Sequence, residues 1–496
     1  MRSAPFSLNL ADKWWVMIAV SLGMFMSLLD STIVNVAIPQ MQRDFGADLV
    51  NIQWVTTIYM ITQAAVIPTA PFLARRLGGK RAYVWSLGAF LIGSVLCGFA
   101  WDLSSLIVFR LLQGIGGGTL LPMVMTLLYG AFPVKERGMA VSIMGIPLMV
   151  APLLGPVLGG LLVTYWGWPW AFFINIPLGL VALAIAQRVL KTADGIREAR
   201  FDGFGFVSVA SGSATLLYGV AGAAEGQGGA KLGFLALGGL ALAAFVLIER
   251  SRVQQGKAVL LDLRRFDDRT FALSNLTNVL VAFTRFGILF LLPVYLQLLR
   301  GQSAAQAGAM LAAQALATLT VLPLAGRLSS RFGPRTVALA GLALLAGGSA
   351  LLLTLSLTLP LWAVLGILAV LGSAFALTQQ LPVAAMSQID KHESAEIANG
   401  STLVSVLQAT AAPLGVAVLS SLVALRTPQH ALTLAPSGLS GEVLERQSTL
   451  AAMHESFALA LGLTLIAFIV MAFVPKYEAE ETAKAENVTI PDTIAS

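Results

Sequence analysis

Two groups of opposite charge stand inside long apolar stretches of this sequence. Asp30 lies within the apolar run 14–39, and Arg110 lies within the run 104–128. A charged side chain at the centre of a bilayer costs roughly 2.5–3.5 kcal/mol on insertion scales, so a structural role alone seldom accounts for one. A buried acid next to a base can form an ion pair that proton binding opens. We therefore expect Asp30 to carry a proton, with Arg110 as its partner.

The two groups are expected at the same depth in a membrane. Asp30 precedes Pro39, at the end of its run, by nine residues, which is ~13 Å along a helix. Arg110 follows Asp102, at the start of its run, by eight residues, which is ~12 Å. Because the two runs cross in opposite directions, both groups fall in the outer half and can pair.

A second guanidinium, Arg285, lies near the middle of the run 271–298. Three interpretations stay open for it: a further partner for Asp30 or for a water chain, a site for an acidic or zwitterionic substrate, or a structural role with backbone carbonyls as partners. In a substrate cavity it would repel cations. Other polar residues within the apolar runs are candidates for lining such a cavity: Asn35, Tyr59, Gln63, Gln113, Asn275, Asn278 and Gln408.

The composition identifies the elements that hold these groups. Of the 496 residues, 57% are hydrophobic and only 11% are charged, whereas soluble domains carry about 25% charged residues. The chain is therefore expected to be an all-α polytopic membrane protein. The net charge of +6 does not predict nucleic-acid binding, because the basic residues stand in short segments between apolar runs.

Several function classes find no support in the sequence. The single cysteine, Cys97, excludes a disulfide framework, and the three histidines show no metal-ligand or catalytic spacing (His392, His430 and His454). No G-x-x-x-x-G-K-[ST] sequence is present, so ATP is not an expected energy source. We expect no enzyme activity, no metal and no cofactor.

Apolar runs long enough to span a bilayer occur fourteen times. Of the 31 Lys and Arg residues, 24 fall on the side of the N-terminus in alternating loops, five fall on the other side, and Arg110 and Arg285 lie within runs. This asymmetry places the N- and C-termini in the cytoplasm. The runs are 14–38, 50–73, 82–100, 104–128, 139–163, 170–190, 203–224, 231–248, 271–298, 305–326, 336–357, 360–382, 398–425 and 456–475.

A short basic motif occurs twice, about half a chain apart. Residues 73–78 and 328–333 both read L-x-x-R-[LF]-G and both follow an apolar run. A repeat at matching places indicates duplicated halves, as transporters have. The expected organisation is an N-terminal six-helix bundle (1–190), two inserted helices with cytoplasmic linkers (191–270), a C-terminal six-helix bundle (271–475) and a disordered cytoplasmic tail (476–496).

One outer segment is longer than the others. Residues 426–455 show no fold signature and are interpreted as an outer loop that serves as a cap or contact surface. A periplasmic adaptor protein is one candidate partner for this loop.

The first run carries the most specific motif. Residues 29–39 read LDSTIVNVAIP, and with it the chain resembles the major facilitator superfamily, within it the fourteen-span drug:proton antiporters of the EmrB/QacA type, over residues 12–475. The resemblance implies two six-helix bundles with two inserted helices, in the inner membrane of a bacterium. It also implies proton-coupled export by alternating access.

Motifs elsewhere extend the resemblance. The segment after the second run is similar to G-x-L-A-D-R-x-G-R-K, but Pro71 replaces its first glycine, Arg75 its acid and Gly79 a basic residue. A charge relay through that acid is therefore missing or rebuilt here. The resemblance implies gating and packing roles for Arg76, Gly78 and Arg81 in this segment. The repeat in the second half of the chain extends the same roles to Arg331 and Gly333.

Three further stretches match patterns of the family. Residues 110–118, RLLQGIGGG, resemble R-x-x-Q-G-x-G, whose arginine is associated with proton transfer. Residues 151–160, APLLGPVLGG, resemble an antiporter motif, and 168–175 match W-x-x-x-F-x-x-N. Small residues allow helices to approach closely and prolines bend them, so a packing and hinge role is expected for Gly114, Gly155, Pro156, Gly159 and Gly160.

The resulting hypothesis is a proton-coupled antiporter that exports amphipathic or hydrophobic compounds, with Asp30 as proton carrier. Protonation of Asp30 would release substrate outward, and the two halves would rock about a site at the midplane. The alternative is an exporter of lipids, fatty acids or other anionic amphiphiles that uses Arg285. The expected partners are small amphipathic substrates, protons and membrane lipids, without nucleic acid.

Overall fold

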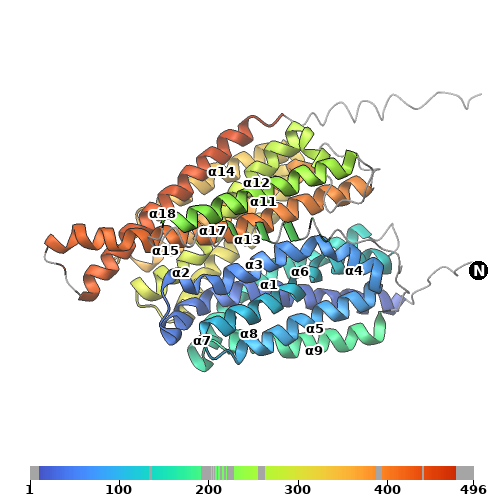
Figure 1. Cartoon of the computed structure of the whole chain (residues 1–496), viewed down its shortest axis with the longest axis horizontal. Helices are drawn as coiled ribbons and strands as arrows, with labels where there is room; N and C mark the ends of the chain where they lie inside the picture. The colour runs from blue at the N-terminus through green and yellow to red at the C-terminus, as the bar shows by residue number, and fades with distance from the viewer. Residues whose placement is uncertain are drawn as a thin grey trace, which may run out of the picture.

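The computed structural model describes residues 10–132, 137–190, 228–254, 263–386, 394–437, 439 and 441–475, with single residues and pairs between 203 and 219. All regular structure in these residues is helical (Figure 1). The first bundle contains α1 (Leu10–Phe45), α2 (Leu49–Ile52), α3 (Trp54–Val66), η1 (Ile67–Thr69), α4 (Ala70–Leu77), α5 (Gly79–Gly98), α6 (Leu103–Ala131), α7 (Arg137–Trp166), α8 (Trp170–Phe173) and α9 (Asn175–Val189).

The second bundle begins after the helix α11 (Gly228–Gln254), which contacts η3. It contains η3 (Leu263–Asp267), α12 (Arg269–Val294), the π-helical turn η4 (Tyr295–Leu299), α13 (Ala304–Phe332), α14 (Pro334–Leu352), α15 (Leu361–Thr378), α16 (Gln380–Met386), α17 (Ser394–Leu434), η5 (Ala435–Ser437) and α18 (Gly441–Ala472).

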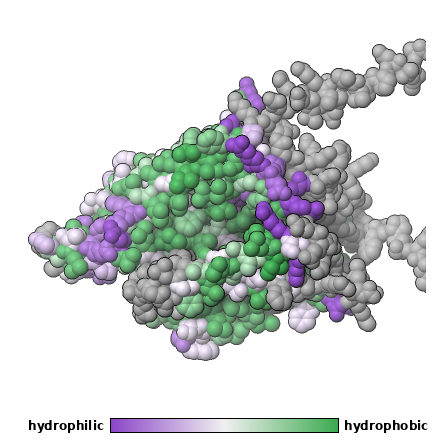
Figure 2. Space-filling view, turned by 45° about the horizontal axis from the view of Figure 1, so that its top comes forward, coloured by the Kyte–Doolittle hydropathy of each residue, from purple (hydrophilic) through white to green (hydrophobic). Residues whose placement is uncertain are grey.

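Ten helices of the described residues are long and apolar enough to cross a membrane. The second predicted span is divided by η1, and the fifth and eighth correspond to α7 and α11. Most of the seventh predicted span, part of the linkers on either side of the two inserted helices and the tail 476–496 lie outside the described residues. Figure 2 shows hydrophobic residues over the middle of one face, with hydrophilic residues toward both ends.

The two bundles have matching internal contacts. Helix α1 packs on α7 and α9, and α12 packs in the same way on α17 and α18. Helix α6 packs on α3 and α5, and α15 packs likewise on α13 and α14. The repeat seen in the sequence is therefore also a repeat of helix packing.

The two copies of the basic motif have the same backbone geometry. Gly78 joins α4 to α5 with φ 82° and ψ 148°, and Gly333 joins α13 to α14 with φ 81° and ψ 150°. Residues other than glycine rarely adopt this region, which is why each copy ends in glycine. We call the end of the molecule with these two turns the basic end.

The bundles pack against each other along two helix pairs, α7 with α13 and α3 with α17. The α7–α13 contact is closest at the end opposite the basic end. There a Cβ at Gly160 would meet the backbone of Ala304 and Ala305, and Ala305 N donates to Thr164 Oγ1 at 2.9 Å. The absence of side-chain bulk at this position lets the two helices touch.

The outer loop predicted at 426–455 is wrong, because this segment is helical. Helices α17 and α18 continue into it as a hairpin that projects beyond the other helices (Figure 1). Arg426 pairs across the hairpin with Glu455, and His430 Nε2 lies 2.8 Å from Glu455 Oε1. The polar residues of 426–455 are thus the exposed and paired positions of two packed helices.

Candidate functional site

The start of α6 fixes the position of Arg110. Asp102 caps the helix by accepting a hydrogen bond from Ser105 N at 2.7 Å, and Ser105 Oγ in turn accepts from Asp102 N at 3.2 Å. Such a reciprocal capping box satisfies two of the free N–H groups at a helix start. Arg110 follows two turns later, inside the first bundle.

Asp30 and Arg110 form a buried ion pair. Arg110 Nη1 lies 2.6 Å from Asp30 Oδ2, and both side chains are 0% exposed. The pairing expected from their depth is therefore present. Among the acids of the described residues only one other, Glu249 near the end of α11, is buried to the same degree.

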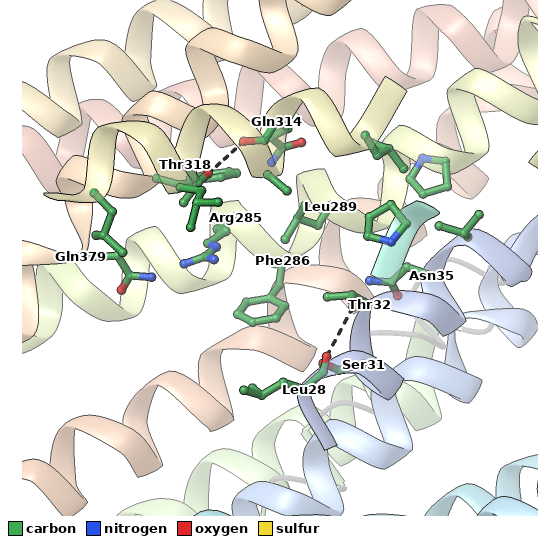
Figure 3. A pocket seen from close by; sticks show the side chains of 18 residues that line it. Leu28, Ser31, Thr32, Asn35, Arg285, Phe286, Leu289, Gln314, Thr318 and Gln379 are labelled. Carbon is green, nitrogen blue, oxygen red and sulfur yellow. Dashed lines mark hydrogen bonds between the residues drawn. The ribbon is translucent and has the colours of Figure 1, made fainter. Parts of the chain in front are cut away.

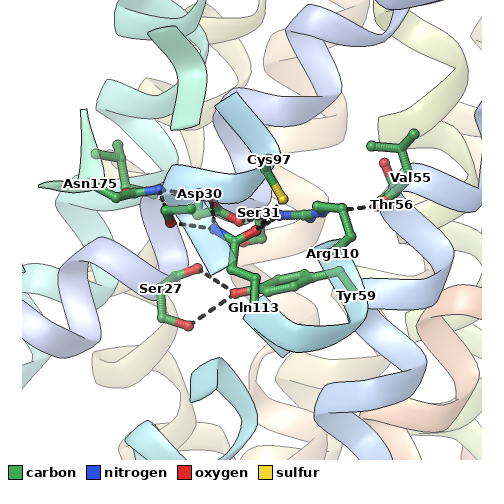
Figure 4. Close-up of polar contacts among 12 residues, drawn as sticks. Ser27, Asp30, Ser31, Val55, Thr56, Tyr59, Cys97, Arg110, Gln113 and Asn175 are labelled. Carbon is green, nitrogen blue, oxygen red and sulfur yellow. Dashed lines mark hydrogen bonds and ion pairs between the residues drawn. The ribbon is translucent and has the colours of Figure 1, made fainter. Parts of the chain in front are cut away.

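Amide side chains complete the surroundings of the carboxylate (Figure 4). Gln113 Nε2 and Asn175 Nδ2 donate to Asp30 Oδ1 at 2.8 and 2.9 Å. Both amides also donate to Ser94 Oγ, at 2.7 and 3.3 Å. Side chains of α6 and α9 thus bond directly to the carboxylate of α1, and Ser94 of α5 joins the network through the two amides.

Arg110 is held by more than the carboxylate. Its Nη1 donates to Gln113 Oε1 at 2.6 Å and its Nε to Val55 O at 2.9 Å, while the guanidinium carbon lies 3.9 Å from the centre of the Tyr59 ring. Within the described residues, Arg110 Nη2 and Asn175 Oδ1 are buried without a hydrogen-bond partner. The network therefore has one spare donor and one spare acceptor beside the ion pair.

A cavity of about 460 Å³ lies between the bundles (Figure 3). Leu28, Ser31, Thr32 and Asn35 line it from α1. These residues follow helical spacing and share one face of α1, whereas Asp30 points into the first bundle. One helix therefore separates the buried ion pair from the cavity.

Arg285 lines this cavity from α12. Its guanidinium carbon lies 5.1 Å from the ring centre of Phe375 and 6.0 Å from that of Phe286. In the described part of the chain no acid pairs with it, and its Nε is buried without a hydrogen-bond partner. The interpretation of Arg285 as a second partner for Asp30 is therefore wrong, because Asp30 faces the other side of α1.

Of the eight predicted cavity residues, the cavity contains Asn35 and Arg285. Gln113 and Tyr59 belong to the ion-pair network instead, and Gln63 Nε2 donates to Ser27 Oγ beside it at 3.4 Å. Asn275 Nδ2 bonds Phe271 O of its own helix at 2.9 Å.

Gln408 and Asn278 form a separate pair in the second bundle, with Gln408 Nε2 donating to Asn278 Oδ1 at 2.8 Å. None of these six residues is among the described residues that line the cavity. Five of them bond to another helix and Asn275 bonds within its own, since a polar residue inside a membrane avoids lipid but can find its partner on a helix as well as in a cavity.

The glycine-rich motifs are packing contacts. A Cβ at Gly114 would meet Thr62, one at Gly155 would meet the Thr32 side chain, and one at Gly159 would meet Ile33. Pro156, beside Gly155, lines the cavity. The motif at residues 151–160 therefore holds α7 against α1 on one side and faces α13 on the other.

The basic residues of the repeat lie on the surface. Arg76, Arg81 and Arg331 are exposed, and the guanidinium carbon of Arg331 lies 5.2 Å from the ring centre of its neighbour Phe332. The side chains of Pro71 and Arg75 lie outside the described residues.

Other members of the site were not selected from the sequence. Asn175 ends the W-x-x-x-F-x-x-N pattern, and that match was the signal that could have identified it. Ser94 carries no such signal. In the cavity wall, Gln314, Thr318 and Gln379 lie near Arg285 (Figure 3).

Comparison with known proteins identifies the family. A model of the Major Facilitator Superfamily matches residues 20–260 and 274–495. The chain is 34% identical to a multidrug resistance protein B homolog of Mycobacterium tuberculosis, over 92% of this chain and 89% of that protein. It is 33% identical to the fatty acid resistance protein FarB of Neisseria gonorrhoeae, over 65% of this chain and 63% of that protein.

A solved structure shares the fold. A bacterial homolog of the human lysosomal transporter Spinster, in an inward-facing and occupied conformation, has a TM-score of 0.66 and 15% identity, over 94% of this chain and 97% of that one. The chain belongs to the major facilitator superfamily, and it is a multi-pass membrane transporter rather than an enzyme.

Proposed function

We propose that this member of the major facilitator superfamily is a proton-coupled antiporter of the fourteen-span drug:proton type, which exports amphipathic compounds from the cytoplasm across a bacterial inner membrane. In this proposal Asp30 carries the coupling proton, Arg110 holds its charged form, and the cavity between the bundles takes the substrate.

The observation that carries the proposal is the position of α1. One face of the helix holds Asp30 in the ion pair, and the other face lines the cavity with Ser31, Thr32 and Asn35. A change in the charge of Asp30 changes the forces that hold α1 against α6 and α9. A shift of α1 would in turn reshape the cavity wall, so one helix couples the two events.

The proposed transport cycle makes use of this arrangement. With Asp30 ionised, its bonds to Arg110, Gln113 and Asn175 hold α1 in the first bundle, and the cavity binds substrate. Proton binding removes the ion pair and frees the guanidinium, which favours the state open to the outside. Release of the proton to the cytoplasm then restores the pair.

The names of two relatives agree with an amphipathic cargo. One is a multidrug resistance protein homolog and the other a fatty acid resistance protein. Drug-sized ligands fill cavities of about 300–1,000 Å³, a range that includes the cavity volume of this chain.

The test is proton exchange in proteoliposomes with an entrapped pH dye and a panel of cationic, neutral and anionic amphiphiles. We expect Asp30→Asn to reduce substrate-driven proton flux to that of protein-free liposomes, because the amide cannot take up the proton.

The matched control is Asp48→Asn, since Asp48 caps α2 at the surface and asparagine is an equally good cap. This variant should transport like the wild type. Wild-type proton exchange in Asp30→Asn would reject the assignment.

A further inference from the structure

We infer that the cavity binds a single-chain amphiphile with an ionised acidic head group, and that Arg285 is the residue that selects the anion. This inference rests on the proposed function and specifies its substrate class. It concerns the cavity and not the proton site, because Asp30 lies on the opposite side of α1.

Arg285 has the properties of an incomplete ion pair. Of the described residues lining the cavity it alone is charged, and no acid stands among them. Arg285 is half-buried in the cavity wall, and a guanidinium partly shielded from water without a counter-charge is costly, a cost that an incoming anion offsets. The rings of Phe286 and Phe375 stabilise its cationic form but supply no acceptor for its N–H groups.

Polar side chains accompany Arg285 on the same part of the wall. Figure 3 shows Gln379 and Thr318 beside it, with Gln314 nearby on α13. Gln314 and Gln379 each carry an amide NH2 donor, whereas the Oε1 of buried Gln314, which has no hydrogen-bond partner in the described residues, is an acceptor and would not pair with an ionised acid. An acidic head group with two or three oxygens could accept from the guanidinium and from an amide donor at once.

The remaining wall is apolar and suits an alkyl or aromatic body. Leu289 and Pro293 follow Arg285 along α12 and reach ~12 Å further toward the end opposite the basic end. Val36, Pro156 and Leu311 cover the same region from the other helices. The volume of about 460 Å³ suits one chain of moderate length rather than a two-chain lipid.

The same geometry disfavours cations. A cationic head group would have to approach an unpaired guanidinium in a site of low dielectric, where like charges repel strongly. The cavity should therefore rank an acid above its neutral ester, and the ester above a quaternary amine of equal chain length.

The test is equilibrium binding of tritiated dodecanoate to the purified full-length protein in a neutral maltoside detergent at neutral pH. Competitors are unlabelled dodecanoate, its methyl ester, dodecyltrimethylammonium and phosphatidate. We expect Arg285→Gln to weaken dodecanoate binding by about tenfold or more, which is the loss of one charged hydrogen-bonding partner. Competition by the ester should be unchanged, and Arg285→Lys should retain most of the affinity.

The control variant is Arg300→Gln, which removes an arginine just beyond the same helix. Arg300 bonds Ser356 O at 2.9 Å and does not line the cavity, so dodecanoate binding should not change. If Arg285→Gln fails to fold, the order in which the wild-type protein binds the acid, the ester and the quaternary amine still shows whether the cavity selects an anion.

Equal affinity of the wild type for acid and ester, or an equal loss of both in Arg285→Gln, overturns the inference. Displacement of dodecanoate by phosphatidate at equal concentration overturns the single-chain assignment. Binding is measured without a pH gradient, so a negative result leaves proton coupling at Asp30 unaffected. Normal proton exchange in Asp30→Asn would reject the proposed function and leave the binding result standing.

Discussion

At the scale of single residues, the centre of the first bundle is organised by one carboxylate. Asp30 accepts three hydrogen bonds from three side chains, and Arg110 has partners on α1, α6 and α3. Removing one partner of a buried pair leaves an uncompensated charge and costs about 3–5 kcal/mol. A free-energy difference of this size is large enough for the charge state of Asp30 to decide whether α1 stays packed against its neighbours.

Asn175 is the residue of this network with the clearest separate test. We expect Asn175→Leu to lower the free energy of unfolding by about 1–3 kcal/mol, because one of the two donors to Asp30 Oδ1 is lost. Thermal unfolding in detergent measures the change. Proton flux in proteoliposomes should fall as well.

Asn51→Leu is the matched control for this change. The Asn51 side chain is exposed, and substitutions at exposed positions usually alter stability by less than about 0.5 kcal/mol. If the two variants unfold at the same temperature, Asn175 does not contribute to the network as described.

At the scale of helices, the two halves use the same turn at the basic end. Gly78 and Gly333 have nearly equal φ and ψ. Gly78 precedes α5 and Gly333 precedes α14, which are the third membrane-spanning segments of their halves. The two positions therefore allow the same experiment to be made twice in one protein.

We expect Gly78→Ala and Gly333→Ala each to destabilise the protein by about 1–3 kcal/mol, because alanine is strained at this backbone conformation. Denaturant or thermal unfolding measures both. The control is Gly88→Ala, in the interior of α5, where a Cβ meets open space and helix propensity favours alanine. Losses that differ widely between the two turns would argue against the equivalence of the halves.

At the scale of the whole molecule, the bundles touch most closely at the end opposite the basic end. Gly160 allows α7 to lie on the start of α13, and Gln297 Nε2 donates to Val36 O at 3.0 Å across the same boundary. Alternating access requires these contacts to separate once in each cycle.

Joining the bundles at this end should stop transport. In the double variant Thr164→Cys and Ala305→Cys, a short thiol crosslinker should join α7 to α13, since Ala305 N and Thr164 Oγ1 are 2.9 Å apart. We expect transport to be lost on crosslinking and restored when a cleavable linker is reduced. The native Cys97 is buried, so it should not react. Full transport after complete crosslinking would mean that this contact does not open.

Much of the fold could be read from local sequence. Apolar runs, the alternation of Lys and Arg, and the repeated L-x-x-R-[LF]-G motif are local patterns, and each reflects a rule of membrane insertion or backbone geometry. The hairpin at 426–455 was missed because polar residues at the ends of long helices look like a loop when their partners are unknown. Arg426 and Glu455 find each other only once α17 and α18 are packed.

The sequence by itself determined that Asp30 and Arg110 were buried charges at one depth, since hydropathy and helical rise need no partner information. Only the tertiary structure decided which way each polar residue points. Tyr59, Gln113 and Asn175 turn toward the ion pair, while Arg285 turns into the cavity on the other side of α1. Helical spacing fixes the relative directions along one helix, but the rotation of each helix is set by its neighbours in the bundle.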